Sequence, residues 1–212
     1  MKKSLVLAFA ALAAGTLASN AAGLKITEVM YTGLYGEFVE ITNTNAPGGA
    51  SIDLTGYVYS DNHRATSGSN AVDLSAIGTL APGKSAIITE ADPSVFDTVW
   101  YGTFTGVTKP SGLVVVGNVT VNLGRNDEVN IYDSIGTLVD RLTYNDQATP
   151  GTDPAGPRTE EFSAVPGPST VLGDNKFKNW VLSVVGTNSA WKSGNHNVSP
   201  NGNGTVGSPG IY

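Results

Sequence analysis

Three carboxylates occur inside stretches of the sequence that alternate like β-strands. Glu28 falls in phase with Ile26, and Glu40 and Asp140 also fall in phase with apolar residues two positions away. Two carboxylates at a defined separation are the groups that cleave glycosidic bonds by acid/base chemistry. One hypothesis is therefore that these residues supply a catalytic pair.

A structural role for the same carboxylates is the alternative, and the sequence favours it. An unpaired buried charge is costly, so such groups sit at sandwich edges, accept hydrogen bonds from loop amides, or pair with Arg125 or Arg141. Structural pairs also perturb carboxylates, and alternation does not reveal depth. We therefore expect Glu28, Glu40 and Asp140 to be structural.

The acidic residues of the expected loops are the candidates for a metal site. Ca²⁺ needs only carboxylate and carbonyl oxygens, and Asp61, Asp127 and Glu128 supply carboxylates in such segments. None of these segments has the ligand spacing and turn glycine of an EF-hand, and Asp is a common turn residue. A zinc site needs three or four closely spaced ligands, whereas His63 and His196 are far apart in a chain without cysteine. We expect no cofactor, with Ca²⁺ as the one ion left open.

Nucleophilic catalysis has little support in the sequence. There is no cysteine and no Gly-x-Ser-x-Gly segment, and both histidines lie in polar segments without apolar periodicity. We therefore expect that the protein is not an enzyme and has no catalytic residues. The alternative from another functional class is a secreted hydrolase that uses carboxylates, assisted by Ca²⁺.

Aromatic residues offer a different interaction, which is stacking on sugars. Trp191, Tyr57 and Tyr59 are the candidates for ligand binding, and Trp191 is expected to be exposed because it stands outside any apolar pattern. Nucleic acid is not favoured as a partner, because basic residues are scattered and only Lys176 and Lys178 form a small cluster.

The N-terminus is organised like an export signal. Two lysines precede an apolar stretch from Leu5 to Leu17, which small residues follow. Spanning a membrane as a helix takes about 20 strongly apolar residues, so we expect cleavage after Ala21 and no remaining membrane span. Removing residues 1–21 takes away two lysines and no acids, which changes the formal charge from -6 to -8. A protein this acidic is repelled by phosphate backbones and anionic membranes.

The remaining chain is typical of many short strands separated by turns. Gly, Pro, Asn and Ser punctuate short β-branched runs, which favours an all-β fold. The expected strands lie at 24–31, 37–42, 54–59, 86–88, 113–116, 119–123, 128–132, 137–144 and 180–185. One short helix is also expected, with Asp92 as its N-cap and Pro93 as its first residue.

The domain organisation follows from these patterns. We expect a signal peptide at 1–21, one β-sandwich domain at 22–190 and a tail at 191–212. The tail is rich in Asn, Gly, Ser and Pro, so residues 195–212 are expected to be poorly ordered.

Several short segments also follow one another in a characteristic order. They read "LKITEVMY", "GEFVEITN", "IDLTGYVYSD", "TLAPGKSAIIT" and "NLGRNDEVNIYDSIGTLVDRLTYND", with "NW" and "GSPG" later in the chain. Together they resemble bacterial lamin tail domains, although Tyr57 stands where a Trp is common. The resemblance implies an immunoglobulin-like β-sandwich of a family that is commonly secreted, and it brings no catalytic residues.

A sandwich of two antiparallel sheets buries alternate residues and leaves the intervening polar residues in water. The expected core residues are Ile26, Phe38, Val39, Ile41, Leu54, Ile88, Val129, Ile131, Leu142 and Tyr144. The expected function is a secreted, non-catalytic module at the cell surface or outside the cell. It would recognise a protein or a polysaccharide, or have a structural role there, through the loops of the sandwich.

Overall fold

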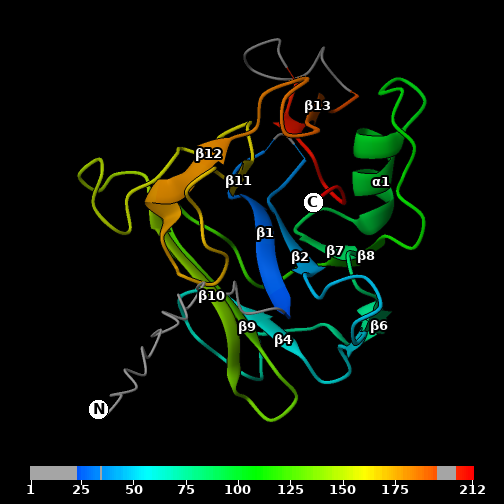
Figure 1. Cartoon of the computed structure of the whole chain (residues 1–212), viewed down its shortest axis with the longest axis vertical. Helices are drawn as coiled ribbons and strands as arrows, with labels where there is room; N and C mark the ends of the chain where they lie inside the picture. The colour runs from blue at the N-terminus through cyan, green and yellow to red at the C-terminus, as the bar shows by residue number, and fades with distance from the viewer. Residues whose placement is uncertain (1–22, 34, 195–203) are drawn as a thin grey trace, which may run out of the picture.

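The strands assemble into two main β-sheets with one α-helix beside them (Figure 1). The computed structural model describes residues 23–33, 35–194 and 204–212. The expected signal peptide at 1–21 and His196 lie outside the described residues. The all-β, sandwich-type fold that the sequence predicts is confirmed.

The larger sheet has six strands, with the expected first hairpin at its centre. Across the sheet the order is β12 (Trp180–Leu182), β11 (Ala164–Pro166), β1 (Leu24–Met30), β2 (Phe38–Asn43), β7 (Ser85–Thr89) and β8 (Val114–Gly117). Neighbouring strands are antiparallel except β7 and β8, which are parallel.

The smaller sheet has four strands and contains the second expected hairpin. Its order is β10 (Leu138–Asn145), β9 (Asn126–Tyr132), β4 (Val58–Ser60) and β5 (Val72–Asp73). Two further pairs are β3 (Ile52–Asp53) with β6 (Thr79–Leu80) and β13 (Trp191–Lys192) with β14 (Val206–Gly207). Short 3₁₀ helices cover Ser75–Ile77 and Phe177–Asn179.

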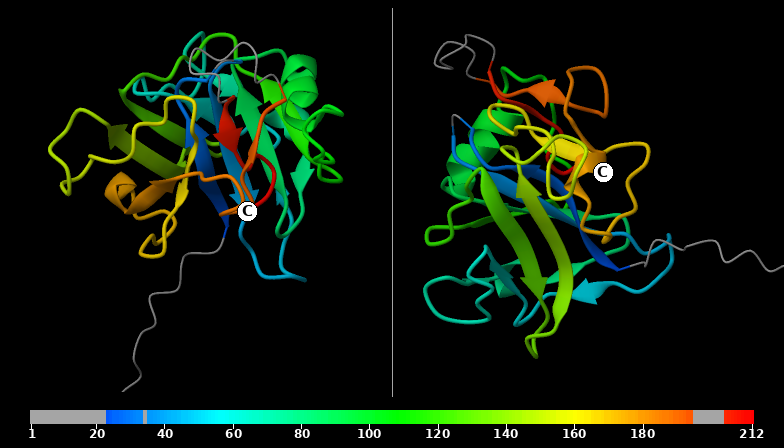
Figure 2. Two further views of the ribbon diagram at one scale, coloured as in Figure 1. Left: turned by 90° about the horizontal axis from the view of Figure 1, so that it is seen from above. Right: turned by 90° about the vertical axis from the view of Figure 1, so that its left-hand side faces the viewer.

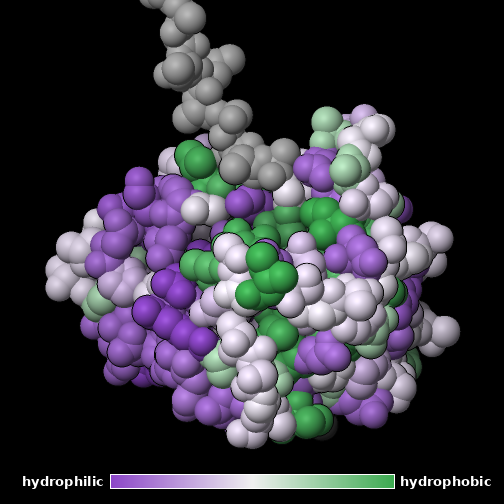
Figure 3. All heavy atoms as spheres, turned by 90° about the horizontal axis from the view of Figure 1, so that it is seen from below, coloured by the Kyte–Doolittle hydropathy of each residue, from purple (hydrophilic) through white to green (hydrophobic). Residues whose placement is uncertain are grey.

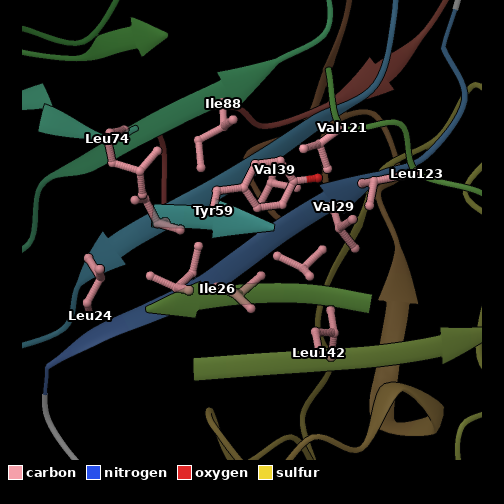
Figure 4. Packing of buried hydrophobic residues seen from close by; sticks show 14 of the residues in the cluster. Leu24, Ile26, Val29, Val39, Tyr59, Leu74, Ile88, Val121, Leu123 and Leu142 are labelled. Atoms are coloured by element: carbon pink, nitrogen blue, oxygen red, sulfur yellow. The ribbon is translucent and has the colours of Figure 1, made fainter. Parts of the chain in front are cut away.

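The main hydrophobic core lies between the two sheets. Figure 4 shows Val39 from the six-stranded sheet beside Tyr59 from the four-stranded sheet, and Ile88 and Leu142 belong to the same cluster. Every residue that the sequence predicts for the core is buried. Removing these apolar side chains from water is the main favourable contribution to folding in a chain without disulfides.

A second apolar layer covers the other face of the six-stranded sheet. The helix α1 (Pro93–Tyr101) lies there, on the side away from the four-stranded sheet (Figure 2). Phe38 from the sheet packs against Phe96 and Trp100 of the helix, with ring centroids 5.6 Å apart in each pair. Trp191 completes this aromatic cluster by an edge-on contact with Trp100.

The start of α1 has the residues that the sequence predicts. Asp92 is the N-cap, and its side chain accepts a hydrogen bond of 2.8 Å from the Ser94 amide, while Pro93 is the first helical residue. No helix in the described residues is long and apolar enough to cross a membrane.

The sequence expectation that alternate polar residues face water is wrong for the central strands. β1 and β2 are buried along their whole length, including Thr27, Glu40 and Thr42. Alternation assumes that one face of the sheet is solvated. Here both faces are covered, so the polar residues of the second face are also enclosed.

A β-bulge also changes the expected phase of β1. The register with β2 shifts between Ile26 and Glu28. Ile26 therefore belongs to the main core, whereas Met30 packs with the aromatic cluster. The extra residue breaks the period of two, so Glu28 does not share a face with Ile26 as the sequence predicted.

Other strand expectations also need correction. Residues 119–123 form no strand, and Val119 is 87% exposed. Leu54 is fully buried but lies outside any strand. The strand β11 was not predicted from the sequence, because its three residues are too few to show an alternation of apolar and polar side chains.

The C-terminal residues differ most from the expectation of a poorly ordered tail. Residues 204–209 are buried, and Val206–Gly207 pairs with Trp191–Lys192. The segment lies against the sheet because its backbone amides find acceptors there, which composition alone does not reveal.

We expect Ile41→Ala to lower the free energy of unfolding by about 2–5 kcal/mol, the usual cost of emptying a packed core position. Ile41 has 0% exposure, whereas Ile135 in the β9–β10 turn is 85% exposed. Ile135→Ala should therefore change stability by less than about 0.5 kcal/mol. Chemical denaturation of both variants measures the difference, and equal midpoints would contradict this placement of β2.

Candidate functional site

The most unusual polar feature is a pair of buried glutamates in the centre of the six-stranded sheet. Glu28 on β1 and Glu40 on β2 are cross-strand partners, and each is 1% exposed. They lie on the face that also carries Phe38, because the β-bulge moves Glu28 onto it. The structure thus brings together two of the three carboxylates that the sequence singled out.

Glu28 accepts hydrogen bonds from residues far away in the sequence. Its Oε1 accepts from the Ser208 amide at 2.8 Å and from the Ser163 hydroxyl, and its Oε2 accepts from the Ser208 hydroxyl at 3.1 Å. Both oxygens are therefore occupied by donors of the protein itself.

Glu40 is bonded in the same way. Its Oε1 accepts from the hydroxyls of Thr27 at 2.5 Å and Thr42 at 3.3 Å. Its Oε2 accepts from the Gly210 amide. The last residues of the chain are thus tied to both glutamates through their backbone.

Burial dominates the acidity of this pair. Removal from water raises the pKa of Glu28 well above its ordinary value, and the nearby Glu40 carboxylate raises it further. Burial likewise raises the pKa of Glu40, while hydrogen bonds from Thr27 and Gly210 act in the opposite direction. The pair therefore holds protons more tightly than solvated carboxylates do.

The chemistry open to the pair is limited by these contacts. A hollow of about 220 Å³ lies beside it, lined also by Ile211 and Tyr212. All four carboxylate oxygens already accept hydrogen bonds from the protein. A general acid or base must reach the proton that it transfers, and here the protein's own donors occupy those positions.

Asp140 does not join the glutamate pair. Its Oδ2 accepts a hydrogen bond of 2.8 Å from the amide of Ile26, a residue of β1 that has no partner in β11. Its Oδ1 accepts a hydrogen bond of 2.9 Å from the Arg141 amide. Burial raises its pKa. The sequence predicted loop amides as donors to such carboxylates, whereas the donors to Asp140 are amides of the strands β1 and β10.

The expectation that Arg125 or Arg141 pairs with one of these three carboxylates is wrong. The Arg125 guanidinium pairs with Asp146 at 2.9 Å. Arg141 donates a hydrogen bond to Asn130 and lies 3.7 Å from Glu128. In the described residues, neither arginine forms an ion pair with Glu28, Glu40 or Asp140.

Glu37 is a buried carboxylate that the sequence reasoning missed. It is 4% exposed, and it accepts hydrogen bonds from the Leu123 amide at 2.5 Å and the Asn118 side chain at 3.3 Å. Burial raises its pKa to about 8. Glu37 stands two positions before Val39 and in phase with Ile41, so alternation contained the signal.

The calcium candidates are engaged elsewhere. Two hydrogen bonds of 2.6 and 2.8 Å join Glu128 to Arg64, and they lower the pKa of Glu128 to about 2. Asp127 accepts from the amides of Asn62 and Glu128, and Asp61 accepts from the amide and ring of His63. Among the described residues, no group of three or more His, Asp or Glu side chains is arranged to hold a metal ion.

The aromatic candidates for stacking on a ligand are mostly internal. Tyr59 has 0% exposure and Trp191 has 8%, so the expectation that they are available to a ligand is wrong. The Trp191 indole donates a hydrogen bond of 3.0 Å to the Trp100 carbonyl. Tyr57 is partly buried against the main core. These rings serve packing, where large aromatic side chains bury most area.

Comparison with known proteins adds one finding. A family model described as Lamin Tail Domain matches residues 18–146. The match ends before β11, so the strands that complete the large sheet and the C-terminal segment lie beyond it. No curated protein matches the chain.

The acidity of Glu37 predicts how stability changes with pH. Its carboxyl keeps a proton up to about pH 8 when folded but loses it near 4.5 when unfolded. Its contribution to stability is therefore present below pH 4.5 and is lost as pH rises through about 8, by at most about 1.4 kcal/mol per pH unit.

Glu37→Gln should remove this contribution, so the free energy of unfolding of the variant should fall less between pH 5 and pH 8 than that of the wild type. Urea denaturation at several pH values measures both slopes. Glu160→Gln is the matched control, because the Glu160 side chain is 47% exposed and should leave the slope unchanged. Parallel wild-type and Glu37→Gln profiles would contradict the assignment.

Proposed function

The chain belongs to the lamin tail domain family, and from this premise we propose that it is a secreted, non-catalytic module that recognises a protein or polymer outside the cell or has a structural role at the cell surface. The observation that carries the proposal is the bonding of Glu28 and Glu40. The best-placed carboxylates for chemistry are used to hold the protein's own C-terminal segment.

The outer surface offers exposed apolar side chains that a partner could contact. Figure 3 shows one face of the molecule, on which hydrophilic residues gather on one side and hydrophobic residues lie between polar ones on the other. Ile135 and Val119 stand on turns and loops with 85% and 87% exposure. Loops on a rigid β-scaffold commonly carry binding residues.

The negative net charge of the protein limits the class of partner that it can bind. The chain without residues 1–21 has a formal charge of -8, because two lysines and no acids are removed from a chain of -6. A neutral polymer or a basic protein surface suits this charge, whereas nucleic acids and anionic membranes are repelled.

A carboxylate hydrolase is the second candidate, and one observation favours it. Glu28 and Glu40 are neighbours, and burial raises the pKa of each, as acid/base catalysis requires of a general acid. The same residues accept hydrogen bonds from Ser208 and Gly210, which lie where a substrate would have to reach. We therefore rank this candidate below recognition.

Export is tested by expressing the full chain in a bacterial host and determining the N-terminus of the product. We expect the protein in the extracellular or cell-surface fraction with Ala22 as its first residue, because the leader has the charged, apolar and small-residue regions of a signal peptide. A variant with Leu7→Arg in the apolar region should remain inside the cell. A wild-type product in the cytosol that retains its leader would refute secretion.

Binding and catalysis are separated by one assay of the mature protein on insoluble polysaccharides, cell-surface proteins and phosphoesters. We expect sedimentation with one polymer or capture by one protein, without turnover above a heat-treated control. Glu40→Gln should bind as the wild type does. Turnover that disappears in a folded Glu40→Gln variant would favour the hydrolase instead.

A further inference from the structure

We propose that residues 204–210 form a proton-controlled latch, which is docked while at least one carboxyl of the Glu28–Glu40 pair is protonated and is released when both carboxyls are ionised. This inference concerns a conformational device and does not depend on the proposed function.

The segment is held largely through its backbone. The Ser208 and Gly210 amides donate to Glu28 and Glu40, and the Pro209 carbonyl accepts a hydrogen bond of 2.6 Å from the Tyr101 hydroxyl. Backbone contacts of this kind are also how extended peptides bind to folded domains.

Thr205 and Val206, in the first half of the segment, are also held by backbone hydrogen bonds. The Val206 carbonyl accepts from the Ser163 amide at 2.9 Å, and the Val206 amide donates to the Glu161 carbonyl at 2.8 Å. The Thr205 carbonyl accepts from the Ser193 amide at 2.8 Å. The segment is thus held between residues 161–163, which precede β11, the strand β13 with Ser193 after it, and the glutamate pair.

Two glycines of the segment lie too close to their neighbours for a side chain to fit. A Cβ atom on Gly207 would lie 2.9 Å from Glu28 Oε1 and 3.0 Å from Trp100. Gly210 has a φ of +82°, which side chains rarely adopt, and a Cβ there would lie 2.6 Å from Leu113. The two glycines let the amides at Ser208 and Gly210 reach the carboxylates.

Docking also encloses the carboxyl pair without a cation beside it. The hydroxyls of Ser85 on β7 and of Ser163, which immediately precedes β11, face the pair and carry no charge. The titratable groups that face it are the phenols of Tyr101 on α1 and of Tyr212. Burial is the main cause that raises the pKa of each phenol. In the described residues, no lysine or arginine forms an ion pair with either glutamate.

The direction of the proton effect follows from this enclosure. Release of the segment exposes both carboxyls to water, which lowers their pKa toward the ordinary value. Docking therefore takes up protons. For each proton taken up, the docking equilibrium constant falls about tenfold for every unit by which pH rises, in the range where the docked pair titrates. The segment should be docked in mild acid and released in mild alkali.

Hydrogen exchange followed by mass spectrometry on the intact mature chain tests the latch between pH 5 and pH 9. After correction for intrinsic exchange rates, the protection of residues 204–212 should fall at least about tenfold across this range. Strand β9 should remain protected, which distinguishes release of the segment from global unfolding.

Glutamine variants separate the proton effect from general destabilisation. Glu28→Gln and Glu40→Gln imitate the protonated carboxyl, so residues 204–212 should remain protected at pH 9 in both. Glu37→Gln is the matched control: Glu37 is also buried, but its partners are Leu123 and Asn118, so the wild-type profile should persist.

Equal protection of residues 204–212 at pH 5 and pH 9 in the wild type would overturn the proposal. So would a wild-type pH profile in the folded Glu28→Gln and Glu40→Gln variants. If neither glutamine variant folds, the wild-type profile compared with that of Glu37→Gln decides alone.

Discussion

Enclosure of the six-stranded sheet on both faces is the constraint on which the rest of the structure depends. The four-stranded sheet covers one face, and α1 with the C-terminal segment covers the other. Any polar group on the central strands must then be satisfied inside the protein, because water cannot reach it. The serine and threonine hydroxyls around Glu28 and Glu40, together with the amides of Ser208 and Gly210, meet this requirement.

Much of the fold could be predicted because alternation and turn residues report local geometry. Ile41, Val129 and Leu142 are buried as their phase in the sequence requires, and Asp92 caps the helix. The bulge after Ile26 could not be predicted, because an extra residue in a strand leaves no compositional trace.

The candidate site could be predicted only in part, for a similar reason. Alternation placed Glu28 and Glu40 in phase with apolar residues, but it revealed neither their depth nor their partners. Ser208 lies 180 residues from Glu28, in a segment whose Gly, Ser and Pro content is typical of a flexible tail. Trp191 looked isolated for the same reason, since its neighbours in space come from α1.

The bond between Glu28 and Ser208 has a consequence for the order in which the protein folds. The first strand and the segment that contains Ser208 meet at one carboxylate, across a sequence separation of 180. Closing so long a loop costs entropy and favours slow folding. Until Ser208 has left the ribosome, β1 can pair with β2, but Glu28 lacks the two hydrogen bonds that Ser208 donates to it. A chain that stops short of Ser208 therefore leaves Oε2 of Glu28 without its donor inside the central sheet.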